Sequence, residues 1–233
     1  MAVKRNISTE LQHIASILQG NNICSDISPI NKAIADLKKG FCNIQKLKFK
    51  VDTIPNNTRP NVKSLDILLS VYIKEEECPK DNICNVVNEK YNFVLEISGK
   101  NGQKTVHSSW HLDYDNSSES DYVHPHFHLT YGGKAMKDKE LGDLILLPTP
   151  RIAYPPMDAI LGIDFILSNF LKKNKYNQIK AISQYKTAVK NSQQRLWQPY
   201  MLSLARHWCG FKNCGHYITD TNLSGQYFPT LIV

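Results

Sequence analysis

The chain has 233 residues and a mass of 26.6 kDa, with 42% hydrophobic, 21% charged and 9% aromatic residues. These proportions are those of a globular protein with a hydrophobic core, and they exclude the disordered and fibrous classes. The first residues lack the apolar run of a signal peptide, and the best apolar stretch, residues 159–167, contains Asp164. We therefore expect a cytoplasmic protein that does not enter a membrane, with its six cysteines present as thiols or metal ligands.

Positive charge is concentrated in the C-terminal part of the chain. The net charge is +7, and no acidic residue occurs between Asp164 and Asp220. Such a block of one sign is typical of proteins that bind nucleic acid, phosphate-rich ligands or an acidic protein partner, although a solvated helix surface gives the same pattern. Because no nucleic-acid-binding motif is present, binding would be independent of base sequence. The residues predicted to bind a polyanion are Lys172, Lys173, Lys175, Lys180, Lys186, Lys190 and Arg195.

Hydrophobic periodicity divides the chain into helices, then strands, then helices. Apolar residues at three- and four-residue spacing predict helices over residues 10–18 and 30–39, each followed by a glycine. A period of two then predicts the strands, which are separated by turn residues. The five predicted strands lie near residues 44–51, 65–73, 91–97, 105–112 and 123–131. The helical period returns over residues 157–173, 176–190 and 192–207.

Segregated helices and strands indicate an α+β fold rather than alternating βαβ units. We expect N-terminal helices, a five-stranded antiparallel meander sheet, and C-terminal helices packed on one face of that sheet. The prediction is a single domain over residues 1–233. Alternatively, the prolines near residues 148–156 mark a domain boundary between the sheet and the basic helical part.

Three histidines alternate along one predicted strand. In the run His124-Pro-His126-Phe-His128, alternation places all three imidazoles on one face, about 7 Å apart. On the preceding strand, His111 and Asp113 share a face in the same way. If residues 114–122 close a hairpin, His111 or Asp113 meets the histidine row.

This arrangement suits a divalent metal ion. Two neighbouring histidines and one residue of the adjacent strand can complete a three-ligand site, whereas His124 and His128 are too far apart, about 13 Å, to share an ion. Zinc is the metal expected, and an open fourth position would hold a water of lowered pKa for hydrolysis. Manganese, iron and nickel accept the same ligands. The predicted metal ligands are His111, Asp113, His124, His126 and His128.

The same run also resembles the histidine triad family of nucleotide hydrolases and transferases. The family signature alternates histidine with apolar residues and often continues into two glycines; here it corresponds to residues 124–130, followed by Gly132 and Gly133. The resemblance covers residues 124–136 only. It implies that His126 attacks an α-phosphate and forms a nucleotidyl intermediate, while His124 and His128 orient it and protonate the leaving group.

A structural interpretation needs neither metal nor substrate. Pro125 cannot donate to a sheet ladder and indicates an edge strand, where polar histidines deter pairing with another chain.

A second group of metal-binding residue types lies near the C-terminus. Residues 207–216 contain two cysteines and two histidines, and Gly210 and Gly215 allow tight turns between them. Such a site would hold structural zinc, the alternative being free thiols in a loop. The candidate ligands are His207, Cys209, Cys214 and His216.

Together these features predict a metal- or histidine-dependent hydrolase that cleaves phosphoester bonds in nucleotides or nucleic acid. His126 would be the central ligand or nucleophile, and the basic C-terminal block would hold the polyanion. The alternative is a non-enzymatic partner-binding protein, for example of a bacterial toxin–antitoxin or phage-defence pair, whose histidine strand docks the partner.

Overall fold

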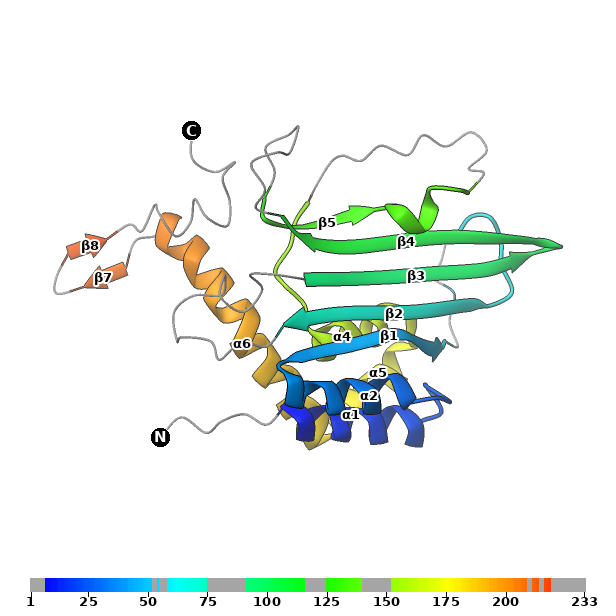
Figure 1. Ribbon diagram of the computed structural model, residues 1–233, viewed down its shortest axis with the longest axis horizontal. Helices are drawn as coiled ribbons and strands as arrows, with labels where there is room; N and C mark the ends of the chain where they lie inside the picture. Colours follow the sequence, from blue (N-terminus) through cyan, green and yellow to red (C-terminus); the bar gives the residue numbers. More distant parts are fainter. Residues whose placement is uncertain are drawn as a thin grey trace.

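The computed structural model of the protein describes residues 7–51, 54, 58–74, 91–115, 125–139, 152–208, 211–213 and 216–218. These residues form an α+β fold in which an antiparallel sheet is packed against helices (Figure 1). The sheet strands are ordered β1-β2-β3-β4-β5-β6, so each strand pairs with its neighbour in sequence. The predicted meander is confirmed, with one strand more than expected.

The first two described elements are helices, and the second of them lies beside strand β1. Helix α1 covers Ile7–Gly20 and helix α2 covers Ser28–Asp36, which continues into the 3-10 turn η1, Leu37–Lys39. Gly40 ends this segment with a φ of 83°, a backbone conformation that costs glycine little. The predicted second helix is confirmed, whereas the first begins earlier than residue 10.

The first four strands of the main sheet are longer than the strands predicted from periodicity, whereas the fifth is shorter. A bulge between Ile44 and Leu47 restores the alternation of β1 after the extra residue at Lys46, which has a φ of 52°. The strands are β1 Phe41–Lys50, β2 Leu65–Lys74, β3 Tyr91–Asn101, β4 Lys104–Tyr114, β5 Phe127–Tyr131 and β6 Ile152–Ala153. A separate hairpin contains β7 Phe211–Asn213 and β8 His216–Ile218.

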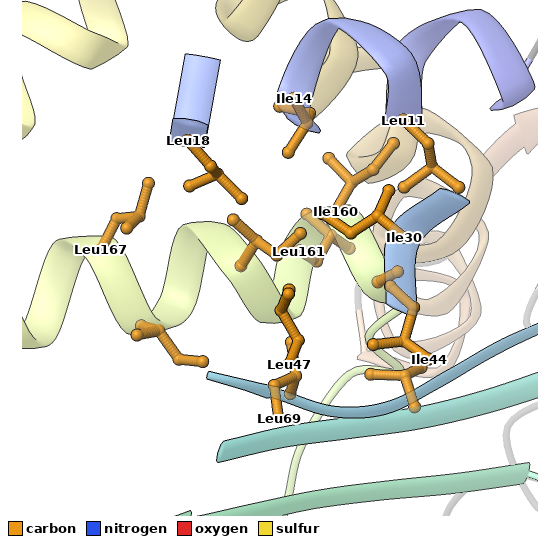
Figure 2. Packing of buried hydrophobic residues seen from close by; sticks show 14 of the residues in the cluster. Leu11, Ile14, Leu18, Ile30, Ile44, Leu47, Leu69, Ile160, Leu161 and Leu167 are labelled. Carbon is orange, nitrogen blue, oxygen red and sulfur yellow. The ribbon is translucent and has the colours of Figure 1, made fainter. Parts of the chain in front are cut away.

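One face of the sheet forms the core with the helices. Its apolar side chains alternate along each strand, as Ile67, Leu69 and Val71 do on β2. Figure 2 shows how Leu and Ile side chains of α1, α2 and α4 meet those of β1 and β2. The opposite surface, called the far face below, carries the alternate residues, including Tyr72, His111 and His128.

Three helices follow the sheet, with bounds that differ from the prediction. They are α4 Ala159–Phe170, α5 Lys173–Ala181 and α6 Ser183–Trp208. Asp158 caps α4 by accepting a hydrogen bond from the N–H of Leu161 at 2.9 Å. The predicted break near residue 191 is wrong: α6 runs through it, and the chain turns at Ile182, whose backbone is extended.

A shared carboxylate explains where the break falls. The hydroxyls of Tyr176 on α5 and Tyr185 on α6 both donate to Oδ1 of Asp164 on α4, at 3.0 and 2.8 Å. Burial and this carboxylate raise the pKa of Tyr176 to about 12, and they also raise the pKa of Tyr185. The two tyrosines therefore fasten α5 and α6 to α4 on either side of Ile182, a tertiary constraint that helical periodicity does not contain.

Within the described part of the chain, no helix has both the length and the apolar character needed to cross a lipid bilayer.

Candidate functional site

The pairing of β4 with β5 brings the predicted site residues together on the far face. Asp113 lies directly opposite His128, and His111 lies opposite Thr130. One residue beyond β4, the N–H of Asp115 donates to the carbonyl of His126 at 2.9 Å. The hairpin expected between residues 105–112 and 123–131 is thus confirmed where the structure describes it. Directly opposite side chains have Cβ atoms about 5 Å apart, so Asp113 and His128 are neighbours.

His111 and Asp113 form the closest polar contact of this group. Nε2 of His111 lies 2.9 Å from Oδ2 of Asp113, with 19% and 38% of the two side chains exposed. Because the carboxylate only accepts, Nε2 carries the hydrogen and the lone pair of neutral His111 lies on Nδ1. A partly exposed imidazole that is oriented by a carboxylate is suited to accept and release a proton.

Gly133 leaves space beside that lone pair. It follows β5, and a Cβ built on it would lie 2.7 Å from Nδ1 of His111 and 2.6 Å from Cε1. Its φ of 73° and ψ of −161° belong to a region that is essentially restricted to glycine. Both the backbone conformation and the close approach to His111 therefore require glycine here.

His128 is held by the chain that precedes β5. It is 3% exposed, and its Nδ1 lies 2.9 Å from the carbonyl oxygen of Pro125. Since a carbonyl only accepts, Nδ1 carries a hydrogen and the lone pair of the neutral ring lies on Nε2. A backbone carbonyl that fixes one ring nitrogen is the usual means of orienting a histidine for metal or proton binding.

His126 lies just before β5, which begins at Phe127. Its ring is half-buried and packs edge to face against Tyr114, with ring centroids 5.9 Å apart. The third histidine of the row, His124, lies outside the described residues. The row of three imidazoles that alternation predicts is therefore seen only from His126 onward.

Strand β5 is not a free edge, contrary to the structural interpretation of Pro125. On the side away from β4 it pairs with β6, where His128 lies opposite Ala153 and Leu129 opposite Ile152. Pro125 precedes the strand instead of interrupting it. A partner would have to replace or extend β6 to pair with the histidine strand.

Among the residues that the structure describes, no three His, Cys, Asp or Glu side chains lie close enough together to hold a metal ion. The predicted zinc ligand set includes His124, which is not among them, so a divalent metal stays a prediction. The structural zinc site predicted near the C-terminus likewise stays a prediction. His207 belongs to α6 and His216 to β8, but the structure does not describe their side chains. Cys209 and Cys214 lie outside the described residues.

The lysines of the basic block lie on α5 and α6 or just before them, and Arg195 differs from them. Its guanidinium contacts Glu10 on α1 at 2.8 Å and Asp158 at 3.2 Å, so two carboxylates already neutralise it. The exposed residues of the block are Lys172, Lys173, Lys180, Lys186 and Lys190, and Lys175 is half-buried. They lie on the helical side of the molecule, not on the far face.

A second group of lysines, absent from the prediction, lies beside the histidines. After β5 the chain stays against β4: the N–H of Gly132 continues the ladder by donating to the carbonyl of Ser109 at 2.8 Å, and Gly133 lies against the ring of His111. The turn η2, Lys134–Met136, follows and buries Met136. Burial first, then the charge of Lys139, lowers the pKa of exposed His107 on β4. The exposed cations of this segment are Lys134, Lys137 and Lys139. Their signal in the sequence is three lysines within the six residues that follow the glycine pair.

Comparison with known proteins gives no match for this chain, whether among protein-family models, curated proteins or solved structures.

Replacing Gly133 with alanine tests the packing around His111. We expect the free energy of unfolding to fall by about 1–3 kcal/mol, because the variant combines an unfavourable backbone conformation with a Cβ inside the imidazole's van der Waals contact. Thermal unfolding followed by circular dichroism measures this change.

Gly102→Ala is the matched control. Gly102 also has a positive φ, of 60°, but no atom lies within 4 Å of a Cβ built there. An equal loss of unfolding free energy in the two variants would show that only backbone strain is destabilising. The His111 side chain would then move aside without a free-energy cost.

Proposed function

We propose that His111, Asp113 and His128 on the far face, together with His126 just before β5, form an acid–base site that hydrolyses phosphoester bonds in nucleotides or nucleic acid. The observation that carries the proposal is the 2.9 Å contact between His111 and Asp113, placed opposite His128 by the strand register. A carboxylate that orients one imidazole beside a second imidazole is suited to proton transfer at neutral pH.

The burial of each side chain suggests its role. His111, with an oriented ring and a lone pair on Nδ1 beside Gly133, takes a proton from the attacking water as the water oxygen bonds to phosphorus. His126, half-buried at the start of β5, returns a proton to the leaving oxygen as its bond to phosphorus breaks. His128 is buried and lies opposite Asp113, so it is a positioning residue.

The charge around the cluster supports a phosphate-containing substrate. Lys134, Lys137 and Lys139 are exposed on the segment that follows β5, and the chain as a whole carries a net charge of +7. Cations near the reacting group attract an anionic substrate and stabilise negative charge that develops on phosphate oxygens.

The test is hydrolysis of bis-p-nitrophenyl phosphate and of a single-stranded oligonucleotide at neutral pH. Asp113→Asn, His111→Asn and His126→Ala are each expected to lower the rate by about 10²- to 10⁴-fold, the usual contribution of a general acid or base. Melting temperatures of the variants show whether each one remains folded.

His107→Ala is the matched control, because His107 lies on the same strand and far face but outside the His111–Asp113 contact. Its activity should equal that of the wild-type protein. Activity that is absent in the wild type, or that survives all three site substitutions, would refute the proposal. Repeating the assay with a chelator and with added zinc, together with elemental analysis, distinguishes metal-dependent from metal-free chemistry.

A further inference from the structure

A groove of about 710 Å³ lies on the sheet next to the histidine cluster. Its volume falls within the range of small-ligand sites, about 300–1,000 Å³. Most of its lining residues are asparagine, glutamine, lysine, serine or tyrosine. The lining residues used below are Asn43, Lys46, Ser70, Tyr72 and Asn92, from β1, β2 and β3.

The strand register connects this groove with the proposed site. Asn43 lies opposite Tyr72, and Tyr72 lies opposite Asn92. Because Phe93 is opposite Leu112 in the antiparallel β3–β4 pair, the next position along places Asn92 beside Asp113. A single row on the far face thus runs from the groove into the cluster. Tyr72 and Asp113 are two strands apart, about 10 Å.

The groove offers three kinds of contact. Tyr72 has its ring stacked on Phe41, with centroids 5.7 Å apart and planes inclined by 23°, which fixes an aromatic surface at the groove. The side-chain amides of Asn43 and Asn92 also belong to the lining, and each provides donors and an acceptor.

The third kind of contact is positive charge. Lys46 is exposed at the bulge of β1, where its own N–H donates to Oγ of Ser70 at 3.1 Å. This hydrogen bond and the φ of 52° hold the backbone of Lys46 out of the regular strand. The sheet therefore sets the backbone position of Lys46 at the groove.

We propose that this groove binds the nucleoside part of a nucleotide, so that the phosphoester bond lies at the histidine cluster. The inference rests on the proposed function and names its substrate class. Base stacking on Tyr72, and hydrogen bonds from the two asparagines and Lys46 to the base or ribose, account for these lining groups. The two-strand distance to Asp113 is comparable to the length of a nucleotide from base to phosphate.

The experiment is a calorimetric titration of the full chain with adenosine 5′-monophosphate and with ribose 5-phosphate, which lacks the base. Wild-type protein should bind the nucleotide more tightly than the sugar phosphate. Tyr72→Ala should weaken nucleotide binding by about five- to a hundredfold, the effect of losing one stacked base, and should leave ribose 5-phosphate binding unchanged.

Asn92→Ala provides a second variant, because Asn92 is exposed and its truncation leaves the core intact. It should weaken nucleotide binding, whereas Asn31→Ala, an exposed asparagine on α2, should not. Equal affinity for the two ligands, or nucleotide affinity that is insensitive to Tyr72→Ala and Asn92→Ala, would overturn the inference.

The two proposals fail separately. Nucleotide binding that depends on Tyr72 without any phosphodiester hydrolysis would support the groove and refute the catalytic site. Hydrolysis that depends on His111 without nucleotide binding would support the catalytic site and refute the groove.

Discussion

Arg195→Met is expected to lower the free energy of unfolding by about 3–5 kcal/mol, the usual result of removing one partner from a buried ion pair. The Arg195 guanidinium contacts Glu10 of α1 at 2.8 Å and Asp158, the N-cap of α4, at 3.2 Å. The three side chains are only 20%, 10% and 13% exposed. Burial lowers the pKa of Arg195, but the two carboxylates outweigh burial and raise it, so the guanidinium stays charged. Methionine fills a similar volume and leaves two carboxylates buried without a counter-charge.

Neighbouring hydrogen bonds make this network the link between three helices. Asn191 of α6 donates to Oε1 of Glu10 at 2.7 Å, and Ser192 donates to Oδ2 of Asp158. Lys190→Met, at an exposed position of the same helix, is the matched control and should change the free energy of unfolding little.

Chemical denaturation measures both variants. Adding Glu10→Gln to Arg195→Met should recover part of the loss, because it removes one uncompensated charge. A loss below 1 kcal/mol, or no recovery when Glu10→Gln is added, would contradict the inference that the charge pairing matters.

Phe93→Ala is expected to lower the free energy of unfolding by about 3–5 kcal/mol, the usual cost of emptying a phenylalanine site in a core. Phe93 on β3 is 1% exposed. Its ring faces Gly162 of α4: a Cβ built on Gly162 would lie 2.6 Å from Cε2 of Phe93 and 3.4 Å from Cδ2 of Leu69. Glycine thus lets the helix approach the sheet, and the aromatic ring fills the space that a side chain would occupy.

A double-mutant cycle checks this packing. Gly162→Ala alone should destabilise by about 1–3 kcal/mol through overpacking, despite the better helix propensity of alanine. In the Phe93→Ala background the new methyl group enters the cavity, so the combined loss should be smaller than the sum. Gly20→Ala, where no atom lies within 4 Å of the new Cβ, controls for helix propensity. Strict additivity in denaturant titrations would exclude the proposed contact.

Part of the candidate site follows from alternation along two strands. The side chains of His111 and Asp113 share a face because they are two residues apart, and the antiparallel pairing of β4 with β5 places His128 beside them. Sequence reasoning predicted this meeting. It did not predict the anchoring of His128 by Pro125, or that the chain after β5 stays against β4. Both depend on backbone geometry after a register is fixed.

The groove shows the limit of sequence patterns more clearly. Asn43, Tyr72 and Asn92 are 49 residues apart from first to last and belong to no motif. They meet because the pairings of β1 with β2 and of β2 with β3 place them in one row across the sheet. Arg195 is a second example, since its position in a basic block predicted that it binds a polyanion, whereas it pairs with Glu10, 185 residues earlier.

The sequence by itself determined the α+β class, the antiparallel meander and the shared face of His111 and Asp113, because these depend on local hydrophobic periodicity and on turns between neighbouring elements. Tertiary structure alone decided the break at Ile182, the pairing of Arg195 and the row from Asn43 to Asp113. Each of these depends on which distant side chains share an environment, such as the Asp164 carboxylate that binds Tyr176 and Tyr185. Local patterns carry no record of distances between segments that are remote in the chain, and packing is what sets them.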